Sequence, residues 1–139
     1  MPEYVAHATT TGGRNGHVES NDGLIKLDLS VPKDIGGPGK AGASNPEQLF
    51  AAGYSACFGG AVDYAAQLEK VKVGAVTVEA DVSIIANPAT GFHLAVKLTT
   101  HVEGIDQATT ERLAHKAHNE ICPYSKATRG NIDVTLAFK

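Results

Sequence analysis

Residues 45–70 read NPEQLFAAGYSACFGGAVDYAAQLEK, and no other stretch constrains the architecture of this chain as strongly. Asn45 and Pro46 are typical of a helix N-cap and first helical position, because the first amides of a helix have no intrahelical partner. From residue 49 to residue 68, apolar side chains surround nearly the whole helix. This distribution predicts a long helix that is buried inside the fold or between subunits, rather than one with a single apolar stripe.

Strands and turns are predicted before this helix. The expected β-meander has strands at 4–11, near 17–20 and at 24–31, with turns at 14–16 and 21–23. Its turns contain Asn-Gly and Asp-Gly, which are the strongest short hairpin signals. The glycine-rich segment 33–44 is predicted to be a plain loop, because it lacks the Gly-Lys-Ser/Thr ending of a phosphate-binding loop.

After the helix, residues 76–86 and 92–101 alternate apolar and polar positions, which predicts a hairpin with one solvated face. Asp106 is expected to cap a second helix, which Pro123 stops. Residues 132–138 alternate again and predict a final strand. This order of elements predicts an α+β fold with antiparallel sheets, in a single domain over residues 1–139.

Composition narrows the classes of partner. The chain has 139 residues, with 12 basic and 15 acidic side chains and a net charge of −3. The charges form no block, so neither nucleic acid nor an anionic membrane is expected as a partner. The longest apolar stretch is too interrupted for a membrane span. The first residues lack the basic and apolar regions of a secretory signal, so a cytoplasmic location is expected.

The chain contains two cysteines, Cys57 within the apolar helix and Cys122 directly before Pro123. In a reducing compartment such a pair is more often redox-active than structural. Burial raises the pKa of a thiol, so Cys57 needs a nearby cation to become a nucleophile. Arg14, beside the tight Asn-Gly turn, is the notable candidate. Glu47 is the notable carboxylate, although a Glu in the first helical turn also stabilises the helix dipole.

Three motifs resemble the organic hydroperoxide resistance proteins, which belong to the larger family that also contains the osmotically inducible OsmC proteins. These motifs are TGGRNG at 11–16, NPEQLFAAGYSACF at 45–58 and ICPYSKATRGNIDVTL at 121–136. They occur in the same order and span nearly the whole chain. The departures are small, with Asn15 where an Asp is common and Lys126 where an Asn is common.

The resemblance implies a role for each of four residues. Cys57 would be the peroxidatic cysteine and Cys122 the resolving cysteine, while Arg14 and Glu47 would form a network around the thiolate. It also implies an intertwined homodimer, in which two sheets wrap around long central helices. The expected substrate is an organic hydroperoxide. The expected reductant is a dihydrolipoyl group, on a lipoylated protein or another dithiol, and no bound cofactor is expected.

The chemistry of thiols agrees with these roles. An ionised Cys57 would attack one peroxide oxygen and become a sulfenic acid, which Cys122 would convert to a disulfide. An external dithiol would then reset the pair by exchange. Leu49, Phe50 and Phe58 are candidates for an apolar pocket that favours bulky organic hydroperoxides over hydrogen peroxide. Tyr124 is a further candidate, for which a role in forming the turn is an equal alternative.

The sequence also offers alternatives to this function. His115 and His118 have helical spacing, but the paired cysteines of a zinc site are missing, so no metal is expected. A thioredoxin-fold peroxidase predicts parallel strands, which the long hairpin contradicts. A non-catalytic redox sensor or small-molecule binder on the same fold remains an alternative.

The positions of Glu47 and Cys57 bear on the expected homodimer. On a straight helix, ten residues give a rise of about 15 Å and leave two side chains about 80° apart in direction. Either Gly53 bends the helix, or Arg14 bridges the two side chains, or Glu47 approaches the partner subunit's Cys57. The all-round apolar character of the helix favours a site that draws on both chains. A line of small residues points to close packing as well: Gly53, Ala56 and Gly60.

Overall fold

The computed structural model describes residues 2–139. The chain divides into two compact units, Met1–Leu49 and Phe50–Lys139. Within the described range, each unit contains one three-stranded sheet. Helix α1 (Pro46–Leu68) starts at the end of the first unit and continues through the second. That the whole chain acts as a single domain stays a prediction.

The first unit is an antiparallel meander in the order β1-β2-β3. Its strands are β1 (Ala8–Thr11), β2 (His17–Ser20) and β3 (Lys26–Asp28). The predicted meander is confirmed: β2 has the predicted bounds, and β1 and β3 are shorter than predicted. A short 3-10 helix, η1 (Gly13–Asn15), forms the first turn. The glycine-rich segment is a loop apart from one turn of 3-10 helix, η2 (Lys33–Ile35).

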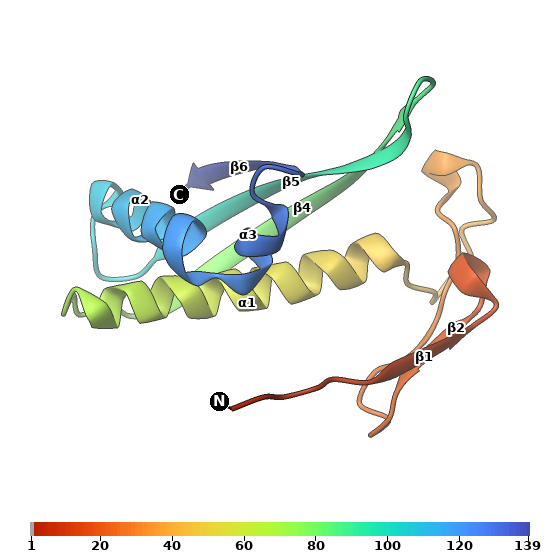
Figure 1. Cartoon of the computed structure of the whole chain (residues 1–139), viewed down its shortest axis with the longest axis horizontal. Helices are drawn as coiled ribbons and strands as arrows, with labels where there is room; N and C mark the ends of the chain where they lie inside the picture. Colours follow the sequence, from red (N-terminus) through yellow and green to blue (C-terminus); the bar gives the residue numbers. More distant parts are fainter. Residues whose placement is uncertain (1) are drawn as a thin grey trace. The chain divides into compact units, whose positions relative to one another are not determined.

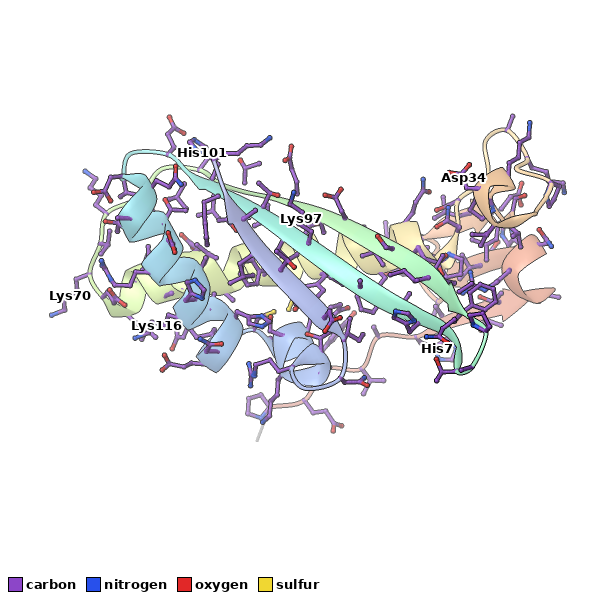
Figure 2. The ribbon with its side chains drawn as sticks, turned by 90° about the horizontal axis from the view of Figure 1, so that it is seen from above. His7, Asp34, Lys70, Lys97, His101 and Lys116 are labelled. Atoms are coloured by element: carbon purple, nitrogen blue, oxygen red, sulfur yellow. The ribbon has the colours of Figure 1, made fainter. Side chains whose placement is uncertain are left out.

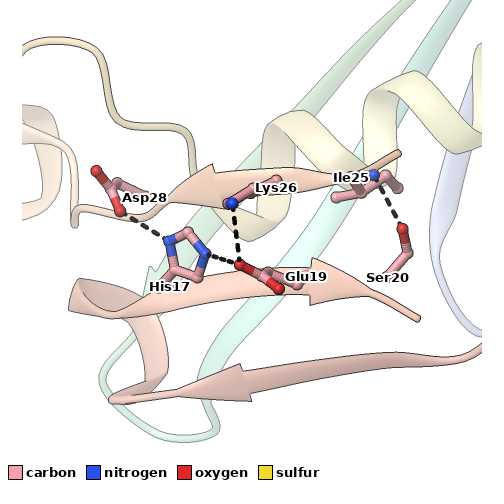
Figure 3. A network of polar contacts seen from close by, with 6 residues as sticks. All are labelled: His17, Glu19, Ser20, Ile25, Lys26 and Asp28. Atoms are coloured by element: carbon pink, nitrogen blue, oxygen red, sulfur yellow. Dashed lines mark hydrogen bonds and ion pairs between the residues drawn. The ribbon is translucent and has the colours of Figure 1, made fainter. Parts of the chain in front are cut away.

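Polar side chains connect β2 and β3 on the exposed surface of this unit (Figure 3). His17 lies between two carboxylates, with Nδ1 2.8 Å from Asp28 and Nε2 2.9 Å from Glu19. These hydrogen bonds, first to Asp28 and then to Glu19, raise the pKa of His17 above its ordinary value. Lys26 lies 3.9 Å from Glu19 on the neighbouring strand. The network therefore joins the two strands by alternating charges.

The start of α1 has the predicted cap. Asn45 Oδ1 accepts a hydrogen bond of 2.8 Å from the backbone amide of Gln48, two positions after the first helical residue, Pro46. This bond satisfies one of the amides that have no partner within the helix. The predicted boundary of the helix is therefore confirmed.

The second unit contains a sheet in the order β4-β5-β6, which runs along α1 (Figure 1). The long hairpin of β4 (Val76–Asn87) and β5 (Gly91–Val102) is antiparallel, as predicted. Strand β6 (Asp133–Phe138) instead pairs in parallel with β5, so the prediction of purely antiparallel sheets is corrected in this detail. The physical reason is the helical crossover between β5 and β6, which returns the chain to the same end of the sheet. The α+β class is confirmed.

The crossover consists of α2 (Gln107–Lys116), a π-helical turn η3 (Ala117–Ile121) and α3 (Pro123–Thr128). Asp106 caps α2 as predicted, because its side chain accepts a hydrogen bond of 2.8 Å from the amide of Thr109. Arg112 of α2 lies 3.0 Å from Glu69, just after the end of α1. These contacts hold α2 beside the C-terminal end of α1.

The core of the second unit lies between the sheet and the helices. Its largest fully buried apolar side chains are Tyr54, Phe58, Val62, Leu98, Val102 and Leu113. Lys97 and His101 are exposed on β5, as the alternation predicted (Figure 2). Helix α1 was predicted to be buried on nearly all sides. Within this unit it is buried on one side, while Tyr64 is 49% exposed and Leu68 is 51% exposed. Among residues 2–139, no helix combines the length and apolar character needed to cross a bilayer.

Candidate active site

The two thiols meet within the second unit. Cys122 is buried and Cys57 is partly exposed, and both are free thiols. Cys122 Sγ lies 3.5 Å from Cys57 Sγ, close enough for a weak S–H to sulfur hydrogen bond. A disulfide bond is about 2.05 Å long, so the sulfur atoms need to approach by only about 1.5 Å to bond. The structure therefore brings together the two residues for which a redox reaction was predicted.

A π-helical turn helps to set the position of Cys122. The amide of Cys122 donates a hydrogen bond of 2.8 Å to the carbonyl of Ala117, five residues earlier. Pro123 then begins α3, and Cys122 Sγ accepts a hydrogen bond of 3.4 Å from the amide of Ser125. The sequence predicted that the helix stops at Pro123, but the wider turn before it has no recognisable pattern. Such turns are frequent at functional sites.

The surroundings of Cys57 act on its ionisation in both directions. Burial raises the pKa of the thiol most, a hydrogen bond from the backbone amide of Tyr124 lowers it, and the neighbouring Cys122 raises it again. The net effect is a raised pKa, which favours the neutral thiol. A positive charge close to Cys57 would oppose this effect and favour the thiolate.

Arg14 and Glu47 form an ion pair within the first unit. Arg14 Nη2 lies 2.9 Å from Glu47 Oε1, and Arg14 Nη1 lies 3.1 Å from Glu47 Oε2. This bidentate contact lowers the pKa of Glu47 and raises that of Arg14. The Arg14 side chain is 44% exposed and the Glu47 side chain 12%. Because an arginine has five N–H donors, the guanidinium can still bind a further acceptor.

The structure thus forms two pairs from the four predicted catalytic residues. Arg14 and Glu47 belong to one compact unit, and Cys57 and Cys122 to the other. Glu47 holds the guanidinium, as expected for a residue that orients Arg14. The effect of Arg14 on Cys57 stays a prediction, as does the choice between one chain and a dimer.

An apolar groove lies in the second unit, with a volume of about 220 Å³. Its lining residues are Phe50, Tyr124, Ala127, Thr128 and Ile132. Two of the predicted pocket residues, Phe50 and Tyr124, therefore come together, with ring centroids 6.5 Å apart. Phe58 is fully buried in the core instead of lining this groove. Leu49 belongs to the first unit, and its place in a pocket stays a prediction.

Tyr124 also explains one of the small residues on α1. A Cβ atom added at Gly53 would lie 3.2 Å from the Tyr124 ring, tighter than most packed contacts. The close approach predicted for Gly53 is therefore made by a side chain of the same chain. At Gly60, a Cβ atom would meet no atom of the described residues within 4 Å. Close packing at Gly60 is therefore not formed within this structure.

A buried group of polar side chains beside Cys122 was not predicted from the sequence. Tyr54, Ser125 and Thr128 join their hydroxyl groups, and His118 contacts Ser125. A buried tyrosine hydroxyl usually has a hydrogen-bond partner, so Tyr54 on an apolar helix was the available signal. Its partners lie more than 60 residues further along the chain and could not be located from spacing. In the part of the chain that the structure describes, no group of three or more histidine, cysteine or acidic residues is placed to hold a metal ion.

Comparison with known proteins places these features in a family. Residues 37–137 match the sequence profile of the OsmC-like protein family, and the chain belongs to this family. It is 51% identical to the organic hydroperoxide resistance protein of Xanthomonas axonopodis pv. citri, over 96% of this chain and 92% of the relative. It is 41% identical to the organic hydroperoxide resistance protein OhrB of Bacillus subtilis, over the full length of both.

A solved structure gives the same result for the fold. The crystal structure of an organic hydroperoxide resistance protein from Legionella pneumophila superposes with a TM-score of 0.91 and 50% sequence identity. The superposition covers 100% of this chain and 99% of the Legionella chain. The resemblance inferred from the three motifs is thereby confirmed.

Proposed function

We propose that this protein is a thiol-dependent peroxidase that reduces organic hydroperoxides to alcohols and so detoxifies them. The observation that carries the proposal is the distance of 3.5 Å between Cys57 Sγ and Cys122 Sγ, within a chain that belongs to the OsmC-like family. Relatives over nearly the whole length are named organic hydroperoxide resistance proteins, which supports an organic hydroperoxide as the substrate.

The reaction begins at Cys57. Its thiolate attacks the terminal oxygen of the hydroperoxide, the O–O bond breaks, and the bond electrons leave with the alkoxide. The alkoxide takes a proton and becomes the alcohol, while Cys57 becomes a sulfenic acid. The partial exposure of Cys57 supports this role, because the attacking sulfur has to meet a substrate from solution.

Cys122 completes the oxidation. Its sulfur displaces the sulfenic oxygen, which leaves as water, and an S–S bond forms between Cys122 and Cys57. A dithiol then exchanges with this disulfide and becomes oxidised in turn, which restores both protein thiols. We propose a dihydrolipoyl group, on a lipoylated protein or another carrier, as this dithiol, with no cofactor bound to the protein.

Arg14 supplies the positive charge that Cys57 lacks. Its planar guanidinium lowers the pKa of the thiol and donates hydrogen bonds to the peroxide oxygens as negative charge develops. Glu47 holds the guanidinium by two hydrogen bonds, which supports a positioning role for this carboxylate. The groove between Phe50 and Tyr124 offers an apolar surface for an alkyl chain.

The active form proposed here is a cytoplasmic homodimer. The apolar character of α1 around nearly its whole surface, with Leu68 exposed near its end, supports a second copy as the partner. A dimer also allows Arg14 and Glu47 of one chain to act on the partner subunit's Cys57. Neither nucleic acid nor a membrane is proposed as a partner, because the charges are dispersed along the sequence.

The test is steady-state consumption of an alkyl hydroperoxide by the purified protein, with dihydrolipoamide as the reductant. We expect turnover with the alkyl hydroperoxide and far slower turnover with hydrogen peroxide or with thioredoxin as the reductant. Cys57→Ser should be inactive, since no other nucleophile is proposed. Oxidation that occurs once without turnover would instead identify a redox sensor, and turnover by Cys57→Ser would refute the assignment of the nucleophile.

A further inference from the structure

A row of buried polar groups lies beside Cys122. Tyr54 Oη is 2.8 Å from Ser125 Oγ and 3.0 Å from Thr128 Oγ1. His118 Nδ1 is 2.7 Å from Ser125 Oγ, and Thr128 Oγ1 is 3.2 Å from the Ser125 carbonyl. Tyr54, Ser125 and Thr128 are almost completely buried. The three hydroxyl groups therefore depend on protein neighbours for their hydrogen bonds, because water does not reach them freely, while His118 is half-buried.

All four contacts can be hydrogen bonds only if the donors and acceptors are arranged in one order along the row. Each hydroxyl has a single hydrogen to donate. If Thr128 donates to the Ser125 carbonyl, Tyr54 must donate to Thr128 and Ser125 must donate to Tyr54. His118 must then donate from Nδ1 to Ser125 Oγ. If His118 instead accepted from Ser125, one of the other three contacts would lack a hydrogen.

The surroundings of His118 agree with a neutral ring. Burial lowers the pKa of His118 most, and the neighbouring Arg129 and His115 lower it further. A neutral imidazole carries one N–H, and the hydrogen-bond row assigns that hydrogen to Nδ1. Arg129 also donates from Nη1 to the carbonyl of His118. The ring is therefore held beside Ser125 in one tautomer.

The row is connected to both sulfur atoms through the backbone of Tyr124 and Ser125. The Ser125 amide donates a hydrogen bond of 3.4 Å to Cys122 Sγ. The Tyr124 amide is hydrogen-bonded to Cys57 and lowers the pKa of its thiol. Two successive amides thus contact the two sulfur atoms, and the side chain of Ser125 is the anchor that fixes this segment.

We propose that Tyr54, Ser125 and His118 are positioning residues that hold Cys122 and Cys57 ready to form their disulfide. The proposal deepens the proposed function, since it concerns the exchange between the same two thiols. With the row intact, the sulfur atoms stay 3.5 Å apart and closure needs little movement. With the row broken, the segment from Cys122 to Thr128 loosens and the effective concentration of one thiol at the other falls.

Tyr54→Phe is the variant that tests the row, because it removes the central hydroxyl and keeps the ring in the core. Tyr64→Phe is the matched control, the same change at a half-exposed tyrosine of the same helix. The measurement is the equilibrium between the Cys57–Cys122 disulfide and dithiothreitol, followed by trapping free thiols with a maleimide. In this exchange the protein S–S bond gains two electrons and two protons, and the dithiol loses them to form a cyclic disulfide.

We expect the equilibrium constant for disulfide formation in Tyr54→Phe to fall about tenfold, the size of one net hydrogen bond in a buried network. For this two-electron couple, a tenfold change corresponds to a reduction potential about 30 mV higher. Tyr64→Phe should match the unchanged protein. Equal constants for Tyr54→Phe and Tyr64→Phe would overturn the proposal.

Variants of His118 provide a second test of the positioning role, which can be used even if Tyr54→Phe does not fold. Asn can place an amide donor near the position of Nδ1, whereas Leu cannot donate. His118→Leu should weaken disulfide formation, and His118→Asn should restore most of it. Nitrogen-15 chemical shifts of the His118 ring report the tautomer and should indicate hydrogen on Nδ1. Hydrogen on Nε2, or equal behaviour of the Asn and Leu variants, would contradict the directed row.

These measurements contain no peroxide, so they separate the two proposals. If the unchanged protein exchanges with dithiothreitol but does not consume alkyl hydroperoxides, the proposed function fails and the positioning role can still hold. If peroxide turnover is normal and Tyr54→Phe has no effect on the exchange equilibrium, the positioning role fails alone.

Discussion

Cys122→Ser removes the thiol that we propose as the resolving residue, with little structural disturbance. Serine is nearly the same size as cysteine and is a favoured N-cap residue, so its oxygen can accept the Ser125 amide that now contacts Cys122 Sγ. Helix α3 should therefore keep its start. The change isolates the chemical role of the sulfur atom from its structural role.

The structure sets the scale of the expected effect. Cys122 Sγ lies 3.5 Å from Cys57 Sγ, at the outer limit of a near-attack geometry. Well-oriented groups at such distances reach effective concentrations of about 10⁵ M or more. Even an effective concentration of only about 1 M exceeds an external monothiol at about 1 mM by about a thousandfold. In Cys122→Ser, we therefore expect reduction of the Cys57 sulfenic acid to be at least about a thousandfold slower than disulfide closure in the unchanged protein.

The assay is rapid mixing with one equivalent of an alkyl hydroperoxide, followed by mass spectrometry of the intact protein. The unchanged protein should lose two hydrogen atoms as the disulfide forms. Cys122→Ser should gain one oxygen atom, and further peroxide should add a second oxygen as sulfinic acid. Sustained turnover of Cys122→Ser with a dithiol, at the rate of the unchanged protein, would show that Cys122 is not the resolving residue.

Three further predictions concern Arg14 and Glu47. Arg14→Ala should raise the pKa of Cys57 and slow the attack on peroxide by at least about tenfold. Arg14→Lys should restore the rate only in part, because an ammonium lacks the planar fork of a guanidinium. If the titration of thiolate absorbance is unchanged in Arg14→Ala, Arg14 is excluded from the site. Glu47→Gln should lower the free energy of unfolding at neutral pH by about 1 kcal/mol or less, because the ion pair is partly exposed. The pKa of Glu47 is lowered from 4.5 in the folded protein. The difference in free energy of unfolding between the variant and the unchanged protein should therefore be full above pH 4.5 and disappear as the pH falls through the folded-state pKa. Chemical denaturation at several pH values would measure it. Co-refolded Cys57→Ser and Arg14→Ala chains should regain part of the activity as heterodimers, and inactive heterodimers of demonstrated composition would argue against a site shared between subunits.

Local patterns in the sequence were sufficient for most elements of the fold. The cap at Asn45 and the hairpin of β4 and β5 depend on residues close together in the chain, and both are present as predicted. The side-chain contact between Arg14 and Glu47 was not predictable in this way, because 33 residues separate them. Only the resemblance to a family suggested that these two side chains act together.

Two thiols, a long capped helix and an α+β order of elements are therefore properties that the sequence determines by itself. They follow from residue type, periodicity and capping, which act over a few residues. The parallel pairing of β6, the π-helical turn before Cys122 and the row from His118 to Thr128 were decided by tertiary structure. The strand pairing and the row depend on contacts between distant segments, such as Tyr54 and Ser125, which are 71 residues apart, and such contacts depend on how the whole unit packs. The π-helical turn is local in the chain, but no pattern of residues marks it.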